Sequence, residues 1–179
     1  MIRAAVLVAL AVLGSGEAVA SERTAAVVRE FKTACATELP DFDRIEAKAV
    51  QENLPVKLDA GSPRGEGFYN HIKSWIVTRD SGLHELSAVE ARGPAGDVST
   101  CALTASDVTG DEAKDELMRV FDIGPPGREN VTPDGLRRSA WFVRVEGEEV
   151  VLLMMDPTPV HRPGIYLNIT YGPVAKTQP

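Results

Sequence analysis

The chain has 179 residues, of which 44% are hydrophobic and 25% are charged, and its formal net charge is −7. This length suits one domain with a sizeable core, and the acidic balance argues against nucleic acid and anionic membranes as partners. The acidic residues are spread along the chain, so a solvated surface is the simpler interpretation of the charge than an acidic docking patch.

The first 20 residues have the pattern of an export signal. Arg3 supplies a positive charge, residues 4–14 (AAVLVALAVLG) are apolar, and the small residues 18–20 (AVA) precede Ser21. The apolar run is shorter than the roughly 20 residues that cross a bilayer, and the pattern is typical of a cleaved signal peptide. We therefore expect a signal peptide over residues 1–20 and a periplasmic or secreted protein without a stable membrane anchor. The alternative is a buried N-terminal helix.

The chain contains two cysteines, Cys35 and Cys101, and both lie after the predicted cleavage site. An even number of cysteines in an exported chain favours a disulfide, and their wide separation argues against a C-x-x-C redox motif or a zinc site. On the chain-entropy model, closing a loop of this length restricts the unfolded chain by about 4 kcal/mol. Two free, buried thiols are the alternative.

The first half of the mature chain is expected to contain two helices and three strands. Apolar residues spaced three and four apart predict a helix from Ser21 to about Glu38, with Cys35 on its buried side. Asp41 can cap a second helix that ends near Asn53. A Gly-rich loop is expected over residues 59–70, followed by strands over 74–79, 83–91 and 98–105.

The second half repeats this order with one helix. A helix is expected over residues 110–122, a Gly/Pro-rich loop over 124–135, strands over 139–146, 149–156 and 164–172, and a frayed tail over 173–179. Consecutive strands with helices between them predict an α+β fold, in which an antiparallel sheet carries helices on one face. We expect a single disulfide-linked domain over residues 21–172. A doubly wound α/β fold would need strict alternation of strands and helices.

The two halves also show a weak similarity to each other. One ungapped shift aligns Asp41 with Asp107, Trp75 with Trp141, and the predicted helices and strands of both halves. The identities are few, so an internal duplication, giving two pseudo-repeats of a helix plus three strands, and chance similarity both stay open.

Part of the sequence resembles a known group of proteins. The segment FKTACATELPDF (residues 31–42), Trp75 and Trp141, and CALTASD around Cys101 are similar to an uncharacterised family of bacterial periplasmic proteins. The resemblance spans most of the mature chain and rests mainly on core and disulfide positions. It implies the compartment and the fold, and it implies no activity and no catalytic residue.

Histidines and carboxylates show no recognised catalytic or metal-binding spacing. His84 begins HELSA, but alanine stands where the zincin motif needs its second histidine. His71 and His161 lie in or beside loops, and Glu90 and Asp156 correspond under the shift but sit at strand ends. We expect no catalytic residue, no metal site and no cofactor. The alternative is a hydrolytic enzyme with an unrecognised carboxylate and histidine site near the first Gly-rich loop.

Residues 139–156 (SAWFVRVEGEEVVLLMMD) predict two strands joined by a turn at EGEE. A strand with one solvated face should alternate apolar and polar residues, but VVLLMM is apolar on both faces. We expect an apolar contact surface formed by Phe142, Leu152, Met154 and Tyr166, and a binding domain without catalysis. Its expected partner is an envelope protein, a second copy of the chain or a small apolar ligand. The alternative is that a curled sheet or a loop covers these residues as core.

Overall fold

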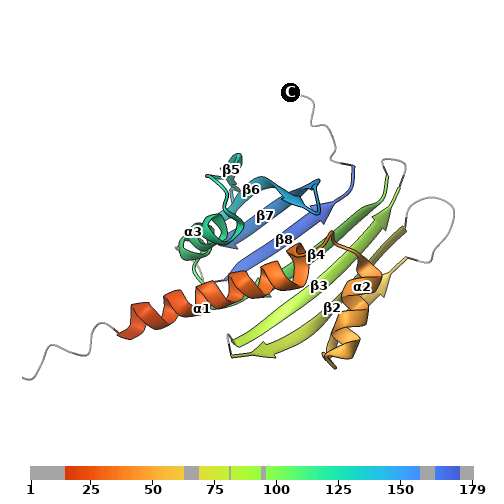
Figure 1. The fold of residues 1–179 in the computed structure, drawn as a ribbon, viewed down its shortest axis with the longest axis horizontal. Helices are drawn as coiled ribbons and strands as arrows, with labels where there is room; N and C mark the ends of the chain where they lie inside the picture. Colours follow the sequence, from red (N-terminus) through yellow and green to blue (C-terminus); the bar gives the residue numbers. More distant parts are fainter. Residues whose placement is uncertain (1–14, 63–68, 81, 94–95, 158–163, 174–179) are drawn as a thin grey trace, which may run out of the picture.

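The computed structural model describes residues 15–62, 69–80, 82–93, 96–157 and 164–173 (Figure 1). The helices in this part of the chain are α1 (Ser15–Phe31), α2 (Phe42–Gln51) and α3 (Gly110–Phe121), and α1 continues as a π-helical turn, η1 (Lys32–Ala36). His161 and the tail over residues 174–179, which was expected to fray, lie outside the described residues.

Eight strands of the described residues form one antiparallel sheet. The strands are β1 (Val56–Gly61), β2 (Tyr69–Arg79), β3 (Gly82–Arg92), β4 (Val98–Ala105), β5 (Arg128–Val131), β6 (Leu136–Val145), β7 (Glu148–Pro157) and β8 (Ile165–Tyr171). Their order is β1-β2-β3-β4-β8-β7-β6-β5, so each half of the chain forms a meander and the halves meet where β4 pairs with β8. The predicted α+β class with an antiparallel sheet is confirmed.

The pleat of the sheet separates buried from exposed side chains. Trp75, Leu86, Leu103, Leu167 and Met154 stand opposite one another on successive strands, and all five are buried. Residues directly opposite each other point to the same side of a sheet. This row is therefore the floor of the hydrophobic core.

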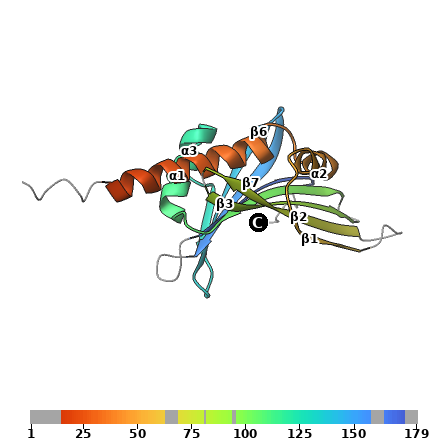
Figure 2. The ribbon, with the colours of Figure 1, turned by 90° about the horizontal axis from the view of Figure 1, so that it is seen from below.

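Helices α1 and α3 pack beside each other against the sheet (Figure 2). The Thr24 hydroxyl donates to Glu112 at 3.0 Å, and the Lys32 ammonium donates to the Val120 carbonyl oxygen at 2.7 Å. Between these contacts, apolar residues of the helices fill the core: Val27, Val28, Phe31, Ala113 and Leu117. Packing of these apolar faces stabilises the helices more than their intrinsic propensity does.

The helix ends follow local rules. Asp41 precedes α2 in an extended conformation, and its carboxylate accepts a hydrogen bond from the Arg44 N–H at 2.8 Å, as predicted for an N-cap. Helix α1 begins at Ser15, earlier than the predicted Ser21. Cleavage after Ala20 would remove residues 15–20 of this helix and leave the buried Val27, Val28 and Phe31 in place.

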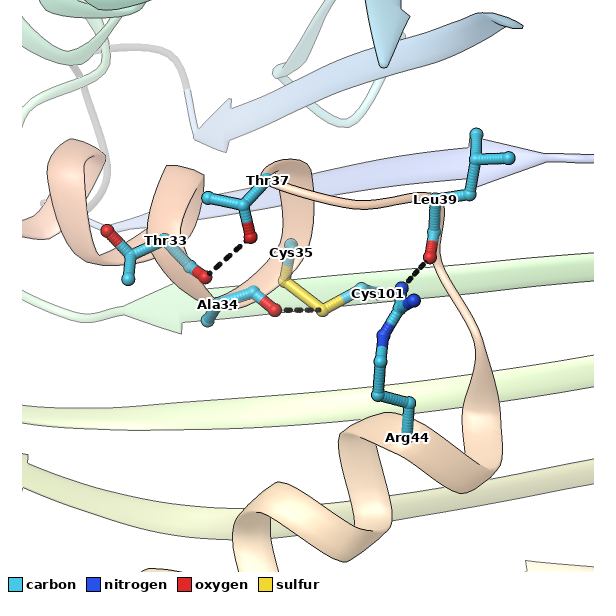
Figure 3. Close-up of a disulfide and its surroundings, with 7 residues drawn as sticks. All are labelled: Thr33, Ala34, Cys35, Thr37, Leu39, Arg44 and Cys101. Atoms are coloured by element: carbon cyan, nitrogen blue, oxygen red, sulfur yellow. Dashed lines mark hydrogen bonds between the residues drawn. A yellow bond between two sulfur atoms is a disulfide. The ribbon is translucent and has the colours of Figure 1, made fainter. Parts of the chain in front are cut away.

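The predicted disulfide is present and joins η1 to β4 (Figure 3). Cys35 and Cys101 are buried, and their Cα atoms lie 5.3 Å apart. The Cys101 sulfur lies 3.9 Å from the Ala34 carbonyl oxygen, so the bond sits directly against the end of the helix. The prediction that Cys35 lies on the buried side of its helix is confirmed.

Both edge strands fall in or beside segments that were predicted to be loops. β1 overlaps the start of the loop expected over residues 59–70, and β5 lies inside the loop expected over 124–135. Every residue of both strands is exposed, so neither carries the alternating apolar pattern that marks a half-buried strand. Both strands are short and carry charged residues, which limits edge-to-edge aggregation.

Candidate contact surface

The turn between β6 and β7 determines which side chains share a face. Glu146 and Gly147 both have positive φ, 52° and 86°, as in the two-residue type I′ turns that join antiparallel strands. Val145 then pairs with Glu148, and the register continues to Phe142 opposite Val151. The turn is therefore two residues long within the predicted EGEE segment.

This register gathers five large side chains on the sheet face that points away from the buried row. Phe142 stands opposite Val151, Met155 stands opposite Tyr166, and Leu153 lies between them on β7. Phe142 is 60% exposed and the other four are half-buried. We call this group the Phe142 surface: Phe142, Val151, Leu153, Met155 and Tyr166.

Two residues of the predicted contact surface lie on the other face. Leu152 and Met154 have 0% exposure, because they stand opposite Trp141 and Ser139 on the buried side of the sheet. The prediction that Leu152 and Met154 share a face with Phe142 and Tyr166 is therefore wrong. The side chains one residue away along the strand, Val151, Leu153 and Met155, share that face instead. Because VVLLMM is apolar in both phases, its composition could not decide between the two faces.

Arginines border the Phe142 surface. Arg138 and Arg144 lie on the same face of β6 as Phe142, and Arg128 of β5 stands opposite Ala140 on that face. All three are exposed, and none forms an ion pair with another residue in the described ranges. Glu149, opposite Arg144, is the acidic residue that β5 to β8 place on this face.

On the buried face, Arg137 forms an ion pair with Asp156. The guanidinium donates to both carboxylate oxygens at 3.0 Å, and a further N–H reaches Asp111 at 2.7 Å. The hydrogen bonds that Arg137 donates to Asp156 raise the pKa of Arg137 further above its usual range. This bidentate geometry holds a carboxylate that is only 2% exposed, and it joins β6, β7 and the first turn of α3.

His71 belongs to a polar cluster near the edge of the sheet. Its Nε2 lies 2.8 Å from Asp59, and its ring centroid lies 4.5 Å from that of Phe42. The hydrogen bond from His71, followed by that from Lys73, lowers the pKa of Asp59. Glu90 stands opposite His71 on β3, so two of the three candidates for a hydrolytic site are neighbours. Asp156 is on β7, in the other half of the sheet.

His84 is buried beside Glu30 of α1. Its Nε2 lies 3.6 Å from the Glu30 carboxylate, and only 2% of the residue is exposed. Burial lowers the pKa of His84 below the usual value for histidine, and the charge of Glu30 partly opposes this shift. His84 therefore contributes to the core.

The described residues form concave regions beside the helices α1 and α2. A cleft of about 380 Å³ between α1, α2 and the sheet has an apolar floor of Val77, Leu86 and Leu103. At its rim, Arg79 pairs with Glu52 and lies 3.6 Å from Glu30. A second hollow of about 260 Å³ lies beside the start of α2 and is lined by Phe42, Glu90, Ser99 and Tyr171.

Within the described ranges, no group of three or more histidine, cysteine or carboxylate side chains is arranged to hold a metal ion. The helices in the same ranges also include none that is both long and apolar enough to cross a membrane.

Comparison with known proteins finds no relative. No family model, no curated protein and no solved structure matches the chain. The resemblance to a family of periplasmic proteins therefore remains a prediction.

Proposed function

We propose that this chain is an exported, disulfide-linked binding domain of the bacterial envelope that acts without catalysis through the Phe142 surface. The partner that fits this surface best is another polypeptide. The observation that carries the proposal is Phe142, a large aromatic side chain that is 60% exposed at the border of four half-buried apolar residues. Exposed aromatics and methionines grouped in this way are enriched at protein contacts.

The arrangement of the helices supports an open outer face. The buried residues of α1, α2 and α3 form one cluster with the buried face of the strands, which includes Trp75, Leu152 and Leu167. We infer that all three helices cover this one face and leave the Phe142 surface to a partner. A sheet with one face packed on helices normally has polar residues on the other, so apolar residues there need a further cover.

We also infer that the domain arose by internal duplication. The shift that aligns Trp75 with Trp141 places β2 over β6, β3 over β7 and β4 over β8, and the bounds never differ by more than one residue. The sheet order is symmetric about the β4–β8 pair. Under this hypothesis the Phe142 surface is where the second copy departed from the first, because Glu85 and Ser87 correspond to Val151 and Leu153 of this surface.

Export is supported by the signal-like N-terminus and by the Cys35–Cys101 disulfide, which is compatible with an oxidising compartment. We propose the periplasm or the cell exterior as the location. The predicted domain limits, 21–172 after a signal peptide over 1–20, belong to the same proposal.

A hydrolytic enzyme is the second candidate, and the Asp59–His71 pair is the observation that favours it. The Ser99 hydroxyl nearby is buried and has no hydrogen-bond partner among the described residues. Against this reading, Lys73 also pairs with Asp59 at 2.9 Å, and the His71 ring packs on Phe42. These contacts assign Asp59 and His71 a role in holding α2 and β1 to β2.

The proposal can be tested by the mass of the complexes that the exported protein forms. We expect the wild-type protein released from the envelope to sediment as a complex and the Phe142→Ser variant to sediment mainly as the 19.2 kDa chain or its processed form. Val50→Ser is the matched control, because Val50 is 65% exposed on α2, away from the surface. Equal complex formation by wild type and Phe142→Ser would contradict the proposal.

A further inference from the structure

The arginines around Phe142 distinguish this region from the rest of the chain. Arg128, Arg138 and Arg144 face the same side as Phe142, opposed there by Glu149, whereas the whole chain carries a net charge of −7. A local excess of positive charge is therefore present on an acidic molecule. It coincides with Phe142, an aromatic residue that is 60% exposed.

The spacing of these residues suits one binding site. Residues 138, 140, 142 and 144 point to the same face, and alternate residues on a strand are about 7 Å apart. Arg144 thus lies two residues after Phe142 along the strand, and Arg138 lies four residues before it. Arg128, opposite Ala140, lies between Arg138 and Phe142 on the neighbouring strand.

Local partners neutralise this charge only in part. Arg138 acts on Asp134, whose pKa is lowered first by a hydrogen bond from Thr132 and, more weakly, by the charge of Arg138. Glu149 stands opposite Arg144 without an ion pair between them. The three arginines therefore exceed the two nearby carboxylates, Asp134 and Glu149, by one positive charge, and exposed arginines are well suited to hydrogen bonds with carboxylates.

From this geometry we infer that the partner of the Phe142 surface is an acidic polypeptide segment, with carboxylates that pair with Arg128, Arg138 and Arg144 and an apolar residue that packs on Phe142. This inference rests on the proposed function. An arginine and aromatic pair at the centre of a contact is a common arrangement of binding hot spots, and complementary charge around it accelerates association and selects the partner.

A polypeptide fits better than the other anionic or apolar partners. An anionic bilayer would face a much larger part of the molecule than the Phe142 surface. The net charge of −7 would then repel the bilayer and outweigh the attraction of the three arginines. A second copy placed face to face would oppose arginines to arginines, which is unfavourable. A short acidic segment meets only the positive region.

The test measures binding of a fluorescent peptide with alternating Glu and Leu residues to the purified, disulfide-bonded mature protein, at low and high salt. We expect binding that weakens as salt rises and that falls by about tenfold or more in Arg138→Gln/Arg144→Gln, because two charge-assisted contacts are lost. The matched control is Arg29→Gln/Arg92→Gln, which removes two exposed charges from α1 and the end of β3. It should bind as the wild type does.

Other probes separate the remaining partners. A peptide of alternating Lys and Leu should not bind, vesicles of phosphatidylcholine and phosphatidylglycerol should not retain the protein, and the free protein should sediment as a monomer. Equal loss in the two double variants, preferred binding of the Lys peptide, or retention on vesicles without peptide binding would overturn the acidic segment. Complex formation in the envelope distinguishes this inference from the proposed function. If it depends on Phe142 but not on the arginines, the proposed binding function is retained and the inference of an acidic partner is contradicted. If it depends neither on Phe142 nor on the arginines, the proposed function and the inference are both contradicted.

Discussion

At the scale of single residues, the phase of the pleat in β7 decides which side chains face the core and which face outward. Phe142 and Val151 share the outer face, whereas Trp141 and Leu152 share the core. The strand itself was predictable from its apolar run, but its phase was not, because both phases are apolar. The two-residue turn at Glu146 and Gly147 is the signal that could have given the register.

Two alanine substitutions test this assignment. Phe142→Ala should change the free energy of unfolding by less than about 1 kcal/mol, because the side chain is largely exposed. Leu152→Ala should cost about 2–5 kcal/mol, because it opens a cavity in the core. Urea denaturation of both variants gives the comparison, and a larger loss for Phe142→Ala would place that residue in the core.

The Arg137–Asp156 pair should be essential for stability. Arg137→Ala leaves a carboxylate that is 2% exposed without its bidentate partner, and breaking a buried pair in this way costs about 3–5 kcal/mol. Arg144→Ala, an exposed control, should stay within about 0.5 kcal/mol of wild type. The prediction fails if thermal and urea unfolding show similar small losses for both variants.

His84 should make stability depend on pH. Because burial lowers the pKa of His84 in the folded protein, the unfolded chain binds more protons, and the free energy of unfolding should fall as pH drops through about 6.5. We expect the free energy of unfolding to fall between pH 7.5 and 5.5 in the wild type, and to fall less in His84→Gln. An unchanged slope in the variant would assign the effect to other groups.

At the scale of elements, the sequence was most informative where an element is half-buried. Helices α2 and α3 and the strands β3, β4, β6, β7 and β8 were predicted near their observed bounds. Strand β2 begins five residues before its expected start and α1 begins at Ser15 and not at Ser21, and the edge strands β1 and β5 were not predicted. An edge strand is held mainly by hydrogen bonds of its backbone to one neighbour, so its side chains carry little pattern. Helix α3 is followed by Asp122 in the left-handed conformation. Glycine is the usual residue at such a position, so the sequence carried no clear signal for the end of this helix.

The disulfide should matter most for the attachment of α1 to the sheet. Replacing Cys35 and Cys101 with Ala should lower the free energy of unfolding by about 4 kcal/mol, because the unfolded chain gains the freedom of a loop of 66 residues. Urea denaturation of the double variant and of the oxidised wild type gives the difference. A change below about 1 kcal/mol, or free thiols in the native protein by mass spectrometry, would contradict a structural bond.

At the scale of the whole molecule, two meanders form one sheet, and the helices are expected to cover one of its faces. The class of fold followed from the order of predicted elements, because consecutive strands favour antiparallel pairing. The strand order did not follow, since the pairing of β4 with β8 joins segments far apart in the chain. The candidate site was predicted in part, through Phe142 and Tyr166, because aromatic residues stand out whereas the phase of an apolar strand does not.

The most direct test of a binding function at this surface is crosslinking from a photoreactive amino acid at position 142 of the exported protein, with the same group at position 50 as control. Both native residues are exposed, at 60% and 65%. We predict a discrete adduct from position 142 that disappears in Arg138→Gln/Arg144→Gln, and none from position 50. No adduct at 142, or the same adducts from both positions, would contradict a contact at the Phe142 surface.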